Sequence, residues 1–215
     1  VRAFLCDARN INSCLSEKVH LVITSPPYIN VFNYHQNYRS LMELLHFNLL
    51  HVAKSEFGSN RKNRSNRFKT VVQYCLDMEI TLYSILEALH ENGKMIMIVG
   101  RESNIRQVPF YNGRIVKQII ETISGFKIID TEERCFYNKF GNRIIEDILI
   151  FQKIGNSAYK SEATFIAQKS LLKAIEYAPE KVKQDIIEAV NDISTITPSP
   201  IFTIKDLIHN ERITP

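Results

Sequence analysis

The sequence lacks the features that mark several protein classes. No stretch of its 215 residues approaches the roughly 18 uncharged apolar residues of a membrane-spanning helix. It also lacks the charged, apolar and small-residue pattern of a secretion signal. The four cysteines, Cys6, Cys14, Cys75 and Cys135, have no close pair and no histidine at ligand spacing. We therefore expect no membrane partner, no metal site, no disulfide framework and a reducing cytoplasmic location.

What is present is an ordinary globular composition with a mild positive charge. Hydrophobic residues make up 45% and charged residues 23%, which excludes disordered, collagen-like and fibrous proteins. The net charge of +4 does not by itself identify a nucleic-acid partner. Basic residues nevertheless gather in one segment, residues 54–69, which holds a single acid, Glu56. The basic residues of this cationic segment are Lys54, Arg61, Lys62, Arg64, Arg67 and Lys69.

The spacing of apolar residues predicts an α/β protein. Runs typical of strands lie at residues 1–6, 19–23, 94–99, 127–137 and 144–153. Patterns typical of helices lie at residues 39–53, 71–89, 115–123, 162–177 and 179–193. Alternating strands and helices predict a parallel sheet, and the last two strands predict a terminal antiparallel hairpin. We expect a three-layer domain over residues 1–154, with Asn92-Gly93 ending its long helix, and a small helical appendage over residues 155–215.

The sharpest local feature is the string Val22-Ile23-Thr24-Ser25-Pro26-Pro27-Tyr28. A hydrophobic strand runs directly into two prolines, which cannot continue a sheet ladder because they lack the backbone N–H. In open α/β sheets, ligands gather at the carboxyl ends of strands, where this turn must lie. The prolines either just end the strand or shape a ligand-binding corner, and the complete string favours the corner.

Thr24-Ser25-Pro26-Pro27-Tyr28 resembles the catalytic motif of the amino-directed DNA methyltransferases, in which Ser, Asp or Asn precedes Pro-Pro and an aromatic residue. The resemblance implies methyl transfer from S-adenosylmethionine to the exocyclic amine of a base that is flipped out of double-stranded DNA. It implies that Ser25 and the carbonyl of Pro26 accept the amine hydrogens. Pro27 would keep that carbonyl rigid and Tyr28 would stack on the base. Serine favours cytosine-N4 as the target, with adenine-N6 as the alternative.

The resemblance extends over residues 2–153. Phe4-Leu5-Cys6-Asp7-Ala8 is similar to a family strand whose acidic residue binds the adenine amino group of S-adenosylmethionine, so Asp7 is assigned to the cofactor, together with Thr24. A helix cap is the alternative role for Asp7. Residues 94–100 and the hairpin ending at residue 151 are similar to later strands of the family. The implied fold is a Rossmann-like methyltransferase sheet.

The sequence departs from the family in its glycines. The glycine-spaced turn that binds the cofactor is absent, and the 7 glycines are spread singly. The family resemblance then implies a partial catalytic domain, incomplete on its amino-terminal side, whose catalysis needs an upstream portion or a second subunit. Such enzymes typically belong to restriction–modification systems. The alternatives are a non-catalytic DNA-binding remnant, and a related methyltransferase that acts on RNA or on a protein glutamine.

Two segments supply predicted DNA contacts. Residues 29–39 are rich in aromatic and amide side chains that can stack on bases and bind base edges. The alternative is a packed loop in which His35 is an ordinary hydrogen-bonded histidine. The cationic segment can contact phosphates, or it can be a solvated loop without a partner. The predicted DNA-binding residues are Asn30, Tyr34, His35, Arg39, Arg61, Lys62, Arg64 and Arg67.

Overall fold

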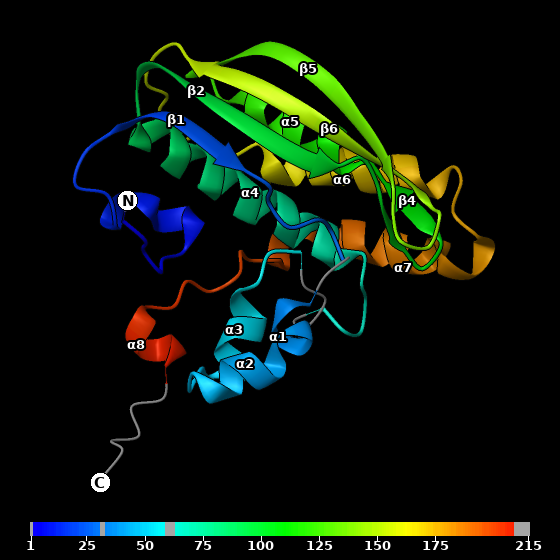
Figure 1. Ribbon diagram of the computed structural model, residues 1–215. Helices are drawn as coiled ribbons and strands as arrows, with labels where there is room; N and C mark the ends of the chain where they lie inside the picture. The colour runs from blue at the N-terminus through cyan, green and yellow to red at the C-terminus, as the bar shows by residue number, and fades with distance from the viewer. Residues whose placement is uncertain (1, 31–32, 59–62, 209–215) are drawn as a thin grey trace, which may run out of the picture.

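The structure, a computed structural model, describes residues 2–30, 33–58 and 63–208 (Figure 1). Its strands are β1 (Val19–Thr24), β2 (Leu89–Gly100), β3 (Ser103–Ile105), β4 (Val108–Phe110), β5 (Phe126–Tyr137) and β6 (Arg143–Lys153). Its α-helices are α1 (Tyr34–Asn37), α2 (Arg39–Leu44), α3 (Leu49–Ser55), α4 (Lys69–Ala88), α5 (Asn112–Thr122), α6 (Ala163–Ile175), α7 (Glu180–Asn191) and α8 (Ile204–Leu207). Two 3-10 helices, η1 (Ala8–Ser13) and η2 (Ile193–Thr195), complete the mixed α/β fold that the sequence predicts.

The main sheet has four strands in the order β1-β2-β6-β5. Strand β1 runs parallel to β2, whereas β6 is antiparallel to both β2 and β5. The predicted terminal hairpin is therefore confirmed as β5 and β6. Because β1 and β2 are parallel, their carboxyl ends lie at the same edge of the sheet. A second, two-stranded sheet pairs β3 with β4.

The sheet is covered on one face. Figure 1 shows α4, α5 and α6 along that face, and no helix of the described residues lies on the other. Along β2, Met95, Met97 and Val99 point into the core, while Ile96 and Ile98 between them stay half-buried. The expected three-layer domain is wrong for the described part of the chain, which has two layers. The strand at residues 94–99 alternates in burial, because one face of the sheet has no covering layer in the described part of the chain.

Three local predictions differ from the structure. Residues 2–6 form no strand and are exposed, because they pair with no neighbouring strand among the described residues. Helix α4 ends at Ala88, and Asn92 and Gly93 lie inside β2. The helix expected over residues 39–53 is divided into α2 and α3. The break is at His46, whose φ of 58° is left-handed, and the N–H of Phe47 bonds the carbonyl of Met42 at 2.8 Å in a helix-ending turn.

The carboxyl-terminal helices share the core of the remaining chain. Helix α6 packs on α4, and α7 packs on α6. Ile166 and Leu171 of α6 and Ile186 of α7 belong to the same hydrophobic cluster as Met95 of β2. The apolar faces of these helices are therefore buried in the common core, and the boundary expected at residue 154 stays a prediction.

The start of the chain and the segment around Ser199 meet at Arg9, whose side chain is buried. Its guanidinium donates to Asp77 of α4 at 3.0 Å and to the carbonyl oxygens of Ser199 at 2.5 Å and Pro200 at 3.1 Å. One side chain thus contacts the η1 region, the long helix and the segment around Ser199. In the described part of the chain, no helix has both the length and the apolar composition of a membrane span.

Candidate functional site

The proline corner, which runs from Thr24 to Tyr28, lies at the carboxyl end of a strand, as the sequence predicts. Strand β1 ends at Thr24, which faces Met97 in the parallel ladder with β2. Ser25 to Tyr28 follow as irregular backbone, because the prolines lack the N–H that further pairing needs. The side chain of Ser25 is exposed, and Pro26, Pro27 and Tyr28 are half-buried. The corner therefore occupies the carboxyl edge of two parallel strands, the usual position of a ligand site in α/β sheets.

Three strands hold the side chain of Tyr28. A Cβ atom added to Gly100, the last residue of β2, would lie 2.5 Å from Cε2 of the Tyr28 ring. The Tyr28 hydroxyl donates to Oε1 of Glu146 in β6 at 3.2 Å. The other oxygen of Glu146 accepts from Nε and Nη2 of Arg134 in β5, at 2.8 Å and 2.5 Å. The ring thus lies against the end of β2 with its hydroxyl directed at a carboxylate.

The surroundings of Tyr28 raise the pKa of its phenol. Burial is the largest cause, and the negative charge of Glu146 acts in the same direction. A hydrogen bond with the Ser25 side chain opposes the rise. Near neutral pH the phenol therefore keeps its proton and acts as a hydrogen-bond donor to Glu146.

The residues after the corner are anchored as well. Ile29 is buried, and its N–H donates to the Asn112 side-chain oxygen at 3.3 Å. The N–H of Asn30 donates to the carbonyl of Gly58 at 2.8 Å. Gly58 has a φ of +62° and lies so close that a Cβ atom would be 2.7 Å from the Tyr28 carbonyl oxygen. Only glycine fits this approach, so Gly58 helps to hold the backbone of the corner in place.

The predicted DNA contacts in residues 29–39 separate into two groups. Tyr34 and Arg39 are exposed, and Arg39 pairs with Glu43 at 2.7 Å. The Asn30 amide donates to the Asn104 carbonyl at 3.3 Å. His35, in contrast, is buried, and its backbone N–H and Nδ1 bond the two Glu56 oxygens at 2.6 Å and 2.7 Å. The imidazole is thus packed inside the protein in this structure, and its contact with DNA stays a prediction.

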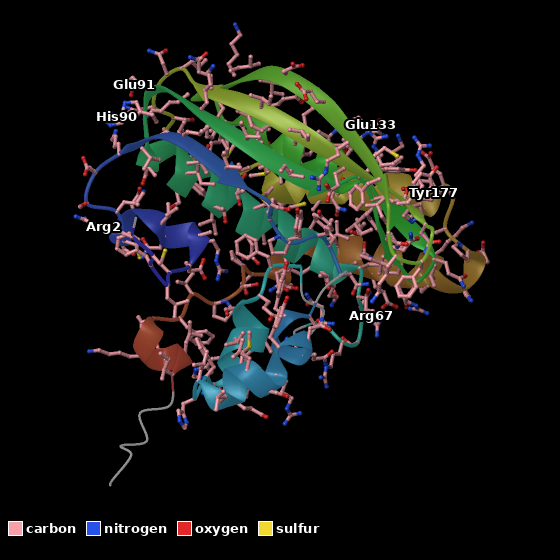
Figure 2. All side chains as sticks on the ribbon, in the orientation of Figure 1. Arg2, Arg67, His90, Glu91, Glu133 and Tyr177 are labelled. Carbon is pink, nitrogen blue, oxygen red and sulfur yellow. The ribbon has the colours of Figure 1, made fainter. Side chains whose placement is uncertain are left out.

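The cationic segment is held by its amides. Asn63 and Asn66 are buried and donate to the Gln73 side chain at 2.7 Å and to the Asp185 carbonyl at 2.6 Å. The side chains of Arg64 and Arg67 are exposed, and Arg67 is labelled in Figure 2. The predicted contacts Arg61 and Lys62 lie outside the described residues. The described part thus presents arginines to solvent on a backbone that is fixed to α4 and α7.

A cavity of about 490 Å³ lies between η1, the end of α3 and the carboxyl-terminal segment. Asp7 lines it together with apolar side chains such as Leu5, Phe202 and Leu207. Its size falls in the range of small-molecule sites. Thr24, the other predicted cofactor residue, is not among the described residues that line it. The structure therefore does not bring Asp7 and Thr24 to one cavity.

Asp7 itself is engaged by Arg9. Its Oδ1 accepts from the backbone N–H and Nε of Arg9, both at 2.9 Å, and its Oδ2 accepts from Nη2 at 2.5 Å. The first of these bonds caps η1, as in the alternative role considered for this residue. A carboxylate offers about four acceptor positions, so about one remains on Oδ2. The apolar walls and this position fit the adenine end of S-adenosylmethionine.

Sequence reasoning missed the residues that hold Tyr28. Glu146 and Arg134 form its carboxylate contact, and Gly100 makes room for its ring. The signal for Glu146 was a charged residue at the start of an otherwise apolar strand. Its partner is 118 residues away in sequence, so the contact itself had no local signature.

Comparison with known proteins gives a structural likeness but no family. No protein-family model and no curated protein matches the sequence. Two crystal structures of a Thermus thermophilus protein, described as a candidate DNA modification methylase, match with a TM-score of 0.39 and 16% identity. They cover 81% and 82% of this chain, which spans 60% and 59% of their length. A candidate hemolysin from Streptococcus thermophilus matches with a TM-score of 0.25 and 15% identity, over 55% of this chain and 40% of its own. Identities and TM-scores as low as these do not assign the chain to a family.

Proposed function

We propose that this chain belongs to a DNA methyltransferase that modifies the exocyclic amine of a flipped base, with cytosine-N4 as the favoured target. The observation that carries the proposal is the corner from Thr24 to Tyr28 at the carboxyl edge of β1 and β2. It presents an exposed hydroxyl, a rigid proline backbone and an anchored aromatic ring within four consecutive residues, 25–28. These are the groups that methylation of a base amine requires.

The chemistry assigns a task to each group. An exocyclic amine is a poor nucleophile because its lone pair is delocalised into the ring. Ser25 Oγ and the Pro26 carbonyl oxygen accept the two amine hydrogens, which favours a tetrahedral nitrogen with a localised lone pair. Tyr28 stacks on the base. Such stacking contributes about 1–3 kcal/mol per base, which offsets part of the few kcal/mol that flipping costs.

S-adenosylmethionine supplies the electrophilic methyl group in this chemistry. Asp7 would bind its adenine end, because the carboxylate lies on the wall of the apolar cavity and keeps one acceptor position. Thr24 would contact the cofactor from the end of β1. Asp7→Asn should therefore weaken the binding of S-adenosylmethionine, measured by equilibrium dialysis without DNA.

This proposal has two alternatives, one for the target base and one for the class of protein. Adenine-N6 is the alternative target, because serine in the first position of the motif favours cytosine without requiring it. A non-catalytic DNA-binding protein is the alternative class, and the engagement of both Asp7 oxygens by Arg9 favours it. Duplexes in which only one of the two candidate amines can receive a methyl group distinguish the two targets. Binding of DNA without binding of S-adenosylmethionine identifies the non-catalytic protein.

The deciding experiment measures transfer of a labelled methyl group from S-adenosylmethionine to double-stranded DNA. We expect Ser25→Ala to lower the rate by about 10²-fold or more, since it removes an acceptor from the reacting amine. Tyr28→Ala should also abolish most of the transfer, because the flipped base loses its stacking partner. Ser16→Ala, an exposed serine before β1, is the matched control and should leave the rate unchanged. Full activity in both corner variants would refute these roles.

A further inference from the structure

Glu146 is a buried carboxylate of β6, and it contacts the corner across the end of β2. It is 8% exposed, and burial of a charge is costly unless the charge is paired. Its two oxygens have separate partners. Arg134 donates two N–H groups to Oε2, and the Tyr28 hydroxyl donates to Oε1. The carboxylate is thus neutralised from β5 while one oxygen stays directed at the tyrosine.

The position of the Tyr28 ring depends on a second feature, the lack of a side chain at Gly100. Three ring atoms of Tyr28 would lie within 2.9 Å of a Cβ atom at this position. The φ of Gly100 is not left-handed, so space rather than backbone conformation requires the glycine here. The ring is therefore limited on one side by the end of β2 and at its tip by Glu146.

We infer that Glu146, held by Arg134, is a positioning residue that fixes the Tyr28 ring in the plane on which the flipped base stacks. This inference rests on the proposed function, because it concerns the same corner. Glu146 acts through Tyr28 and does not touch the reacting atoms. A ring that is already fixed loses less freedom when the base arrives, so the stacked state forms more readily. Sequence reasoning had assigned no role in the site to Glu146 or Arg134.

The first test observes Tyr28 without DNA or cofactor. The groups that face its phenol are Glu146 from β6, Ser25 from the corner and Tyr74 from α4. In protein with ¹³C-labelled tyrosine, the Tyr28 signal is assigned by its loss in Tyr28→Phe and is titrated with base. Glu146→Gln removes a negative charge and keeps the size of the side chain. It should lower the pKa of Tyr28, because Glu146 raises that pKa in the native protein.

The control for this titration is Glu132→Gln, because Glu132 is also a glutamate but is exposed on β5. It should leave the Tyr28 signal unchanged. Arg134→Gln should shift the Tyr28 signal although it does not touch the phenol, since the carboxylate loses its anchor. A Tyr28 titration that Glu146→Gln leaves unaltered would overturn the inference, whatever the outcome with DNA.

The second test uses a duplex with one mismatched 2-aminopurine, which costs little to flip and fluoresces when unstacked from the duplex. Glu146→Ala should weaken binding of the flipped base by about fivefold to tenfold, while Glu146→Gln should restore most of it by keeping an acceptor oxygen. In the Tyr28→Phe protein, which has no hydroxyl to hold, Glu146→Ala should have no further effect. An equal loss in both backgrounds would show that Glu146 supports the fold alone and would overturn the inference. If the wild-type protein binds no DNA, the proposed function fails and the base-positioning role fails with it. The titration then still shows whether the contact exists.

Discussion

Asp77 is a fully buried carboxylate in the middle of α4, and its partners come from both ends of the chain. Arg9 donates to it at 3.0 Å, and the Ser199 N–H and hydroxyl donate at 2.8 Å and 2.6 Å. These bonds offset only part of the cost of removing its charge from water, because burial is the larger effect and raises the pKa of Asp77. The Arg9 guanidinium is equally buried, so loss of Asp77 leaves it with Asp7 as its remaining carboxylate partner.

Removal of this carboxylate should strongly destabilise the protein. Asp77→Ala leaves Arg9 buried without its α4 partner, so we expect the free energy of unfolding to fall by about 3–5 kcal/mol. Asp192→Ala is the control, because Asp192 pairs with Lys69 at 2.6 Å in a partly exposed position. Such a pair contributes about 0–1 kcal/mol. Urea denaturation at neutral pH measures both changes, and similar losses in the two variants would contradict the role given to Asp77.

Single residues show which parts of the site a sequence can reveal. The position of Ser25 to Tyr28 at the end of a strand could be predicted, because consecutive residues carry the whole corner. Asp7 was left with two roles, and the structure adds Arg9, which occupies its oxygens from two residues away. The contact between Tyr28 and Glu146 could not be predicted, because strand order and register bring these residues together. Strand order and register have no local signal in the sequence.

The hairpin of β3 and β4 turns on two residues with left-handed backbone. Arg106 has a φ of 50° and Gln107 a φ of 72°, as in the mirror-image turns that join short antiparallel strands. Glycine and asparagine usually occupy such turns, and neither is present here. The short strands and the unusual turn residues explain why this hairpin had no recognisable signal in the sequence.

Glycine at this turn should stabilise the protein. Gln107→Gly removes the steric cost of a left-handed side-chain residue and should raise the free energy of unfolding by about 0.5–1 kcal/mol. The reverse change, Gly141→Ala, tests the same effect at the tip of the β5–β6 hairpin, where φ is +78° and no atom lies within 4 Å. It should lower stability by a similar amount. Thermal denaturation of both variants checks the pair, and a shift of the same sign in both would contradict the backbone explanation.

The cationic segment should contribute to DNA binding mainly through charge. Replacing Arg61, Lys62, Arg64 and Arg67 with glutamine should weaken binding and make it less dependent on salt. Each lost phosphate contact lowers the slope of log K against log salt by about 0.9. Fluorescence anisotropy across a salt series measures the slope. The control replaces four exposed basic residues elsewhere: Arg2, Lys18, Lys94 and Lys127. An unchanged slope in the segment variant would reject it as a contact surface.

Long elements were predicted better than short ones. The 20-residue α4 and the strands β5 and β6 repeat their pattern often enough to be recognised within a few residues. The division between α2 and α3 depends on the single left-handed residue His46, which propensity does not reveal. Asn92 and Gly93 resembled a helix end, but the chain passes through them inside β2. The ladder with β1 shifts register there, from Leu89 to Lys94, and Asn92 has a left-handed φ of 61°, so the turn signal appears as an irregularity within the strand.

At the scale of the whole molecule, one face of the sheet carries no helix of the residues that the structure describes (Figure 1). Ile96 and Ile98 of β2 lie opposite Ile150 and Ile148 of β6, and Ile23 of β1 extends the same row. Ile23 is 64% exposed. In the described part of the chain, β1 is also the edge strand of the sheet. An apolar face next to an unpaired strand edge favours association between molecules.

We therefore expect the protein to self-associate through this face. Ile23→Lys places a charge on the exposed edge and should lower the fraction of associated species in sedimentation experiments. The free energy of unfolding should change by no more than about 0.5 kcal/mol, because the side chain is largely exposed. Leu44→Lys, an exposed apolar residue on α2, is the control and should leave association unchanged. A wild-type protein that remains monomeric at high concentration would contradict this expectation.

The position of Arg9 links the fates of the two tails. Its guanidinium donates to Asp7 before η1, to Asp77 of α4 and to the carbonyls of Ser199 and Pro200, so loss of any one acceptor leaves this buried group incompletely paired. The tails should consequently open together as one cooperative unit, with backbone amides near both ends losing protection from hydrogen exchange at the same denaturant concentration. Truncation of the chain before residue 199 should thus lower the protection of backbone amides near η1 first.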